Sequence, residues 1–420
     1  MTKTKFAFAA SLMCGAITSV QAADKPPAVY WMSVSTEVGG AFGMGGMAMP
    51  SVGEMVTEGL LGGIFGGSSK SSPSDAGGAR RSVLLQLSGA ETPPDPKADH
   101  FIPPGQNMGE SLPLISPRAG KLSRHEAPDE AQEPEKPKGK ILMYWGCGDK
   151  IRASQPKVLD MATATPQQYA AFFKAFNVSA PRGPRPANGW TYARWPNEKD
   201  SQSVPKDSSL VGPQTIKANY APEIRFDIPR QQDFLDPVVF TEMGSDLTKA
   251  VPFHWKPIPN ATGYFSMAMG GQGDNEMVIW VSSEASHMGW SLMDYVPTGE
   301  VRKLIKERVI MPPSNTECKI PQGVFKDAGA MLQFIAYGQD LDLSHPARPK
   351  NPPKGWMPDW NTKVRLKSTT MTMLGQDPRE KAAAGAGASG GRDYTSQPRK
   401  KGGSEVLENP LKSIKGIFGL

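Results

Sequence analysis

The sequence predicts a mainly β protein, built as a variant antiparallel β-sandwich over residues 140–374 with one or two short helices. Short apolar runs recur in this region, Gly- and Pro-rich turns separate them, and strands do not alternate with helices. The chain of 420 residues contains 44 Gly and 40 Pro, one residue in five, which excludes a helical bundle, a coiled coil and a doubly wound enzyme over the whole length. Its 9 Trp, 16 Phe and 9 Tyr are enough to form a core.

The first 22 residues have the pattern of a secretory signal peptide. Lys3 and Lys5 precede an uncharged, mostly apolar stretch from Phe6 to Val20, and a small residue follows at Ala22. We therefore expect cleavage after Ala22 and a periplasmic or envelope-associated protein. Removal of the two lysines lowers the formal net charge from +6 to +4. This modest charge, with basic residues mixed among 41 acids, predicts that nucleic acid is not a partner.

Two extensions are expected to flank the central region. Residues 23–139 read as a Gly/Met-rich and then Pro-rich arm with one or two strands, Ala28–Val38 and Ser82–Leu87. Residues 375–420 read as a low-complexity tail that ends in a short amphipathic segment. Peripheral contact with a membrane, or docking into a partner, would use the apolar face formed by Leu411, Ile414, Ile417 and Phe418.

The central region is expected to open with a strand over Lys140–Trp145, an apolar run typical of burial on both faces. A capping box at Thr165 and Gln168 then predicts a helix that ends near Asn177. A second helix is expected over Gly299–Glu307. The remaining apolar runs predict strands over Gln214–Ala218, Glu223–Ile228, Val251–Lys256, Gly263–Met269, Glu276–Ser282, Ala330–Tyr337 and Lys363–Met373.

The segment Val251–Tyr264, VPFHWKPIPNATGY, resembles the second and third strands of a fibronectin type III domain. The resemblance implies that Trp255 fills the space between two sheets, with Tyr264 beside it. A wider set of blocks is similar to a group of uncharacterised exported proteobacterial proteins, which implies an exported, fibronectin- or immunoglobulin-like β-sandwich and no particular activity. These blocks are Tyr144–Gly148, Trp255–Tyr264, Trp280–Glu284, Cys318–Pro321, Ala336–Gly338 and Lys363–Ser368.

Cys147 and Cys318 are the cysteines that remain after the predicted signal peptide. An even pair in an exported chain can form a disulfide, and two buried thiols are the alternative. We expect four aromatic residues of these blocks to be core residues: Trp145, Trp255, Tyr264 and Trp280. Because strand residues alternate between faces, a core Trp255 would place His254 on the surface.

The sequence lacks the Gly-x-Ser-x-Gly, His-Glu-x-x-His, phosphate-loop and Cys-x-x-Cys motifs. The polar turn Ser282–His287 nevertheless contains residue types of a nucleophile, a base and an orienting group. An exported hydrolase-like enzyme, with a loop site near Glu284 and His287 completed by Asp340 or Asp342, is therefore one alternative function. A chance polar turn is the other interpretation.

Two further features suggest ligands. Met44, Met47 and Met49 offer thioethers that suit Cu(I), so a copper-handling protein is a second alternative, although a low-complexity linker accounts for the same residues. No other cofactor is expected. The densest basic stretch, Arg348–Lys367, is either a solvated loop and edge strand or a contact for anionic lipid or envelope polymer.

Taken together, these patterns indicate an exported, non-enzymatic binding or structural protein of the periplasm or cell envelope. Its expected partner is an envelope protein or polymer.

Overall fold

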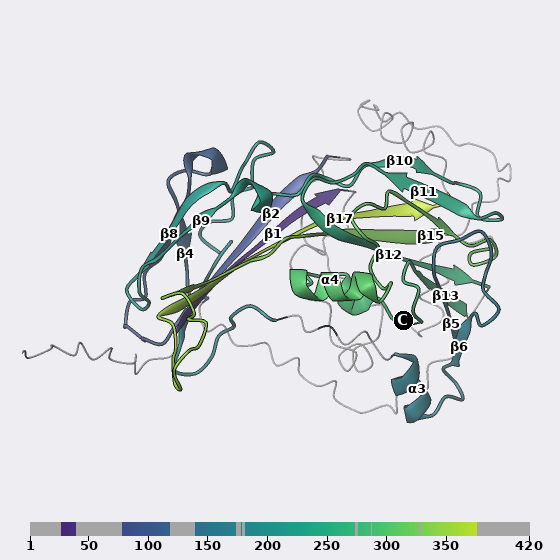
Figure 1. Cartoon of the computed structure of the whole chain (residues 1–420), viewed down its shortest axis with the longest axis horizontal. Coiled ribbons are helices and arrows are strands. Elements are labelled where there is room, and N and C mark those ends of the chain that lie inside the picture. Colours follow the sequence, from purple (N-terminus) through teal and green to yellow (C-terminus); the bar gives the residue numbers. More distant parts are fainter. Residues whose placement is uncertain are drawn as a thin grey trace, which may run out of the picture.

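The computed structural model describes residues 27–38, 78–117, 139–173, 178, 181–273, 276–286, 288–326 and 329–375. In this part of the chain the strands form a ten-stranded, a four-stranded and a three-stranded sheet (Figure 1). The mainly β prediction is therefore confirmed.

The first half of the large sheet joins strands from both ends of the chain. β1 (Ala28–Val38) lies between β17 (Trp360–Leu374) and β2 (Arg80–Gly89), and β7 (Thr191–Trp195) follows β2 at the edge. β1 runs parallel to β17 over its full length and antiparallel to β2. The two strands expected in the N-terminal arm are thus found where predicted, but they are interior strands of a sheet that also contains the C-terminal strand.

The second half of the sheet continues from the other side of β17. Its strands are, in order, β15 (Ala330–Gly338), β12 (Ala261–Gln272), β13 (Glu276–Val281), β5 (Lys140–Trp145) and β6 (Lys157–Asp160). A further strand, β16 (Leu341–His345), pairs with the first part of β17. The β5–β13 pair is parallel, as is β1–β17, so the sheet is mixed where the sequence predicted antiparallel pairing. Parallel pairs join segments with long connections, which local patterns do not reveal.

Both smaller sheets pack on the same face of the large sheet, at opposite ends of it (Figure 1). On β17 this face carries Trp360, Val364 and Leu366, which pack against the four-stranded sheet, and Leu374, which packs near the three-stranded sheet. The four-stranded sheet contains β4 (Ser111–Leu114), β3 (Ala98–Phe101), β8 (Gly212–Ala218) and β9 (Ile224–Ile228). The three-stranded sheet contains β10 (Phe240–Met243), β11 (Val251–Trp255) and β14 (Glu317–Ile320).

Helices cover part of the opposite face. α3 (Pro166–Phe172) and α4 (Thr298–Lys306) pack near β5, β13, β12 and β15 together with the short 3-10 turn Trp290–Leu292. The predicted capping box is confirmed, because the Thr165 hydroxyl accepts from the Gln168 backbone and the Gln168 side chain accepts from the Thr165 backbone. Residues 174–177, the expected end of this helix, lie outside the described residues.

Two other 3-10 turns are neighbours in sequence of strands of the four-stranded sheet. Pro104–Gln106 lies between β3 and β4, and Arg230–Gln232 follows β9. None of the helices in the described ranges has the length and apolar character needed to cross a membrane.

A buried histidine lies between the large and four-stranded sheets. His100 on β3 is 0% exposed, and its Nδ1 is hydrogen-bonded to Oη of Tyr30 on β1 at 3.1 Å. Burial lowers the pKa of His100 to about 4, although a contact with the Gln214 side chain acts in the opposite direction. The imidazole is therefore neutral in the native protein at neutral pH, and protonation has to occur in the core.

We expect His100 to make the fold sensitive to acid. The unfolded imidazole takes up its proton near its ordinary pKa of 6.5, whereas the native one does so near 4, so stability falls as the pH falls through this window. From these two pKa values, we expect the free energy of unfolding to fall by about 2 kcal/mol between pH 7 and pH 4.5. Urea unfolding of the wild type and of His100→Gln at the two pH values measures this contribution.

His100→Gln should flatten the pH dependence of the free energy of unfolding by about 2 kcal/mol relative to the wild type. Equal pH dependence in the wild type and His100→Gln would show that the buried histidine does not titrate in this window.

Candidate functional site

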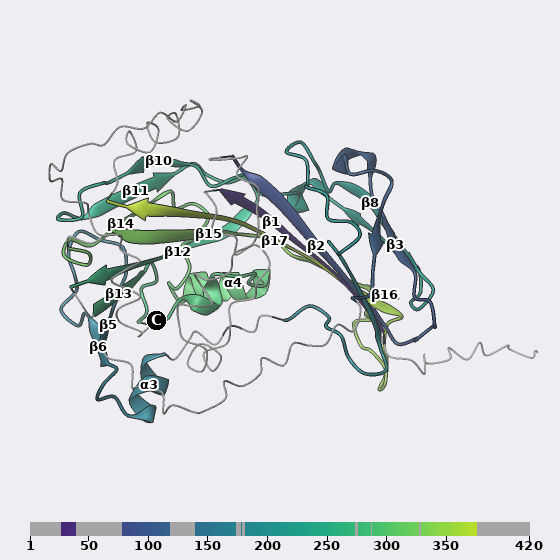
Figure 2. The same cartoon turned by 180° about the vertical axis from the view of Figure 1, so that it is seen from behind.

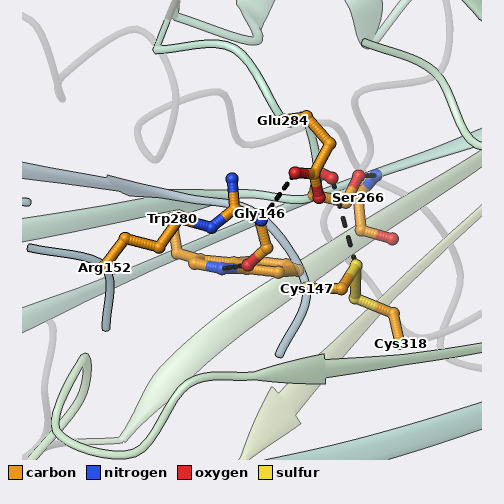
Figure 3. Close-up of a disulfide and its surroundings, with 8 residues drawn as sticks. Gly146, Cys147, Arg152, Ser266, Trp280, Glu284 and Cys318 are labelled. Carbon is orange, nitrogen blue, oxygen red and sulfur yellow. Dashed lines mark hydrogen bonds and ion pairs between the residues drawn. A yellow bond between two sulfur atoms is a disulfide. The ribbon is translucent and has the colours of Figure 1, made fainter. Parts of the chain in front are cut away.

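Of the two alternatives for the cysteines, the structure contains the disulfide. Cys147, just after β5, is bonded to Cys318 on β14 across a sequence separation of 171 residues (Figure 3). The bridge joins the large sheet to the three-stranded sheet, and beside it the Gly148 amide donates to the Lys319 carbonyl at 2.9 Å. This pair therefore fastens one of the covering sheets and forms no site of its own.

The aromatic residues singled out from the sequence are core residues. Trp255 is 2% exposed and lies between the three-stranded and large sheets, with ring centroids 4.8 Å from Phe334 and 5.4 Å from Tyr264. Trp280 is fully buried and donates from Nε1 to the Gly146 carbonyl at 3.0 Å (Figure 3). Trp145 is buried in the core under the helices. His254 is on the other face of β11 from Trp255, as expected, where it contacts Glu242 and Glu317.

Loss of the disulfide should lower the free energy of unfolding by about 3–5 kcal/mol. The bond closes a long loop in the unfolded chain and so lowers the entropy of the unfolded state, and this stabilisation is absent without it. The double variant Cys147→Ala, Cys318→Ala tests this value by urea unfolding. Reductant should destabilise the wild type by a similar amount and leave the variant unchanged. An equal effect of reductant on both proteins would contradict the assignment.

The residues of the predicted enzymatic site have separate partners. Glu284 forms an ion pair with Arg152 at 2.6 Å (Figure 3), whereas Asp340 binds the Thr298 amide at the start of α4 and Lys363. Asp342 also pairs with Lys363. His287 lies outside the described residues. The contacts of the described carboxylates thus bring Asp340 and Asp342 together but do not connect them to Glu284.

The ligand positions expected in the flanking segments lie outside the described residues. This applies to Met44, Met47 and Met49 and to Leu411, Ile414, Ile417 and Phe418. Within the described ranges, no group of three or more His, Cys, Asp or Glu side chains is arranged to hold a metal ion.

A pocket lies where β15, β16 and β17 meet, on the sheet face opposite the two small sheets. Tyr337 of β15 pairs with Lys367 of β17, and Leu341 of β16 pairs with Val364. Three residues, 338–340, therefore oppose only two, 365 and 366, and the extra residue interrupts the ladder. Such irregularities redirect side chains and are frequent beside functional sites.

Cationic and aromatic side chains gather at this interruption. Alternation along β17 places Lys363, Arg365 and Lys367 on one face, next to Trp31 of β1 and Tyr295 of the segment before α4. The Arg365 guanidinium carbon lies 5.0 Å from the Trp31 ring centroid and 4.2 Å from that of Tyr295. The Lys367 ammonium lies 4.4 Å from the Tyr295 centroid. These distances are typical of cation–π contacts.

The two lysines are neutralised by carboxylates. Lys363 Nζ lies 2.8 Å from Asp342 and 3.4 Å from Asp340, and Lys367 Nζ lies 2.8 Å from Asp294. Burial alone would raise the pKa of Asp294, but the Lys367 charge and hydrogen bond keep that pKa below its ordinary value. The pKa of Asp340 is also lowered, because hydrogen bonds from Thr298 and the Lys363 charge outweigh its burial.

Arg365 differs from its two neighbours. Its Nε donates to the Ser33 hydroxyl at 2.8 Å, but no carboxylate of the described residues lies within ion-pair distance of its guanidinium. Burial lowers the pKa of Arg365, an effect that Tyr295 and the more distant Asp294 oppose. The guanidinium is still charged at any physiological pH. Arg365 is thus a largely enclosed cation whose charge lacks a direct partner.

The pocket beside Arg365 is small, about 10 Å³, which is room for the centre of one small group such as a carboxylate or phosphate oxygen. Its lining combines aromatic, proline and charged residues from distant parts of the chain: Trp31, Pro181, Tyr295, Val296, Pro297, Gly338, Asp340, Lys363, Arg365 and Leu366. A planar guanidinium with free donors recognises carboxylate or phosphate oxygens. The chemistry available here is therefore the binding of an anionic group.

Only part of this site could be predicted from the sequence. The basic stretch Arg348–Lys367 contains the cations of the site, and Asp340 and Asp342 belong to the predicted enzymatic site. Trp31 and Tyr295 were missed, because the pairing that brings them to β17 is long-range. Lys363, Arg365 and Lys367 occupy every second position of a predicted strand, and this alternation is the signal that indicates a charged face of the sheet.

Comparison of the chain with known protein families, curated proteins and solved structures finds no match.

Proposed function

We propose that the protein is an exported, non-enzymatic binding protein of the periplasm or cell envelope, and that its ligand presents an anionic group to Arg365. The observation that carries the proposal is the enclosed guanidinium, which lies in a pocket without a carboxylate of the described residues at ion-pair distance. A cation removed from water is costly unless an opposite charge accompanies it.

The neighbouring groups define the class of ligand. Lys363 pairs with both Asp340 and Asp342, and Lys367 pairs with Asp294, so the formal charges of these groups and Arg365 sum to zero. Arg365 is the cation of this group without a carboxylate of the described residues at ion-pair distance, so it is the side chain through which an anion would bind. Trp31 and Tyr295 add flat apolar surfaces beside it. This combination suits a carboxylate or phosphate attached to a larger molecule, such as an acidic envelope polymer or a protein side chain.

We also infer that the region around Trp255 is a variant of the fibronectin- or immunoglobulin-like sandwich. The packing of Trp255 and Tyr264 between the three-stranded sheet and β12, β15 and β13 supports this relationship. Folds of this kind often serve in recognition, which agrees with a binding role, although the fold alone does not identify a ligand.

Arg365→Met tests the proposal with inorganic phosphate as the probe. The wild type should unfold at higher urea concentration in about 100 mM phosphate than in chloride of equal ionic strength, by about 1–3 kcal/mol for millimolar affinity. Arg365→Met should lose this difference. Its stability in chloride should stay within about 1 kcal/mol of the wild type, because an apolar side chain of similar length replaces a poorly compensated charge.

Arg80→Met is the matched control, since Arg80 is an exposed arginine on β2 that pairs with Glu37. It should retain the effect of phosphate, including the general stabilisation that this salt gives to many proteins. If Arg365→Met retained the same phosphate effect as Arg80→Met, the anion-binding assignment would be wrong. A large destabilisation of Arg365→Met in chloride would instead indicate a structural cation–π contact.

A further inference from the structure

The basic stretch recognised in the sequence divides into two parts in the structure. Lys363, Arg365 and Lys367 belong to β17; the first two line the pocket, and Lys367 lies against the Tyr295 ring. Arg348, Lys350 and Lys354 belong to the loop of residues 346–359 that joins β16 to β17, and all three are exposed. Figure 2 shows this loop, in yellow-green, projecting beyond the end of the large sheet next to β16.

The base of the loop is fixed to the sheet. The Asp359 amide donates to the His345 carbonyl at 2.6 Å, and the Ala28 amide of β1 donates to the Asp359 carbonyl at 3.0 Å. The rings of His345 and Trp360 stack across the base with centroids 5.6 Å apart. Prolines restrict the backbone between these points, at positions 346, 349, 352, 353 and 358. The loop therefore presents its side chains from a defined position.

The loop cations are not neutralised within the described structure. No ion pair of the described residues involves Arg348, Lys350 or Lys354, in contrast to the paired lysines of β17. The acidic residue of the loop, Asp359, lies at its base beside Trp360. One short loop thus carries three exposed cations, which favours an anionic partner.

Apolar side chains accompany these charges. Met357 is 43% exposed, and Trp356 next to it is partly exposed in a turn where its amide donates to the Pro353 carbonyl. Tryptophan favours the boundary between water and lipid, and an exposed methionine can enter the acyl layer. A soluble polyanion would engage the cations without making use of Met357, so the combination favours a lipid surface.

We propose that the loop of residues 346–359 docks the protein onto an anionic lipid surface. Arg348, Lys350 and Lys354 would lie among the headgroups, and Trp356 and Met357 at the level where headgroups meet acyl chains. Each basic residue near such a surface changes membrane partitioning about five-fold, so the three together account for roughly a hundred-fold change. This inference is independent of the anion pocket at Arg365.

Vesicle flotation of the full chain tests the proposal. The wild type should float with vesicles of phosphatidylcholine that contain about 30% phosphatidylglycerol, and not with phosphatidylcholine alone. The triple variant Arg348→Gln, Lys350→Gln, Lys354→Gln should bind about a hundred-fold more weakly. Met357→Ser, with all charges retained, should reduce binding about ten-fold because a buried apolar side chain is lost.

A second triple variant supplies the control for net charge. Lys97→Gln, Arg225→Gln and Lys249→Gln remove three exposed cations from other surfaces. This variant should float like the wild type. An equal loss of vesicle binding in both triple variants would show diffuse electrostatic attraction and overturn the proposal. Unchanged flotation of the loop variant would also overturn it and would point to the segment Leu411–Phe418 as the membrane contact. Binding to soluble polygalacturonate without flotation would identify a polymer as the partner and also overturn it.

Discussion

The parallel pairing of β1 with β17 is the interaction on which the rest of the structure depends. It joins residues near the two ends of the chain, since the contacts Arg365–Ser33 and Thr370–Val38 each span 332 positions. β17 has β1 on one side and both β16 and β15 on the other. Without this pairing the sheet would separate into two halves, and the four-stranded and three-stranded sheets would lose their common support.

The same pairing determines where the candidate site lies. One face of β17 is buried along its length against the two small sheets, so its register is strongly defined. A shift by one residue would place Lys363, Arg365 and Lys367 in the apolar core. The apolar face thus fixes the positions of the cations on the opposite face, and the interruption between β15 and β16 leaves room beside Arg365 for the pocket.

Local patterns were sufficient for the elements that depend on neighbours in the sequence. The capping box at Thr165 was found because its two hydrogen bonds join residues three positions apart. β11 and the buried Trp255 followed from alternation and from the fibronectin-like segment. The disulfide agrees with one of the two alternatives that the even number of cysteines after the expected signal peptide left open.

The elements that depend on distant partners were harder to predict. β1 was recognised as a strand, but its place in the middle of the sheet depends on β17, and nothing in the intervening sequence indicates that pairing. Tyr295 lies in an irregular segment, and only the fold brings it to Arg365. The short strands β3 and β4 were missed in a Pro-rich region, because four residues carry too little periodicity to be distinguished from a loop.

The contrast between the two cationic regions follows from their surroundings. Arg365 is largely enclosed and lies against two aromatic rings, so its interaction with an anion would be screened weakly by salt. Arg348, Lys350 and Lys354 are exposed, and their attraction to an anionic surface decays within about 10 Å at 0.1 M salt. Contact through the loop is therefore reversible and sensitive to salt, whereas contact at Arg365 is selective for the shape and chemistry of one anionic group. Because β17 carries Arg365 and begins at the base of the loop, a single strand fixes the positions of both.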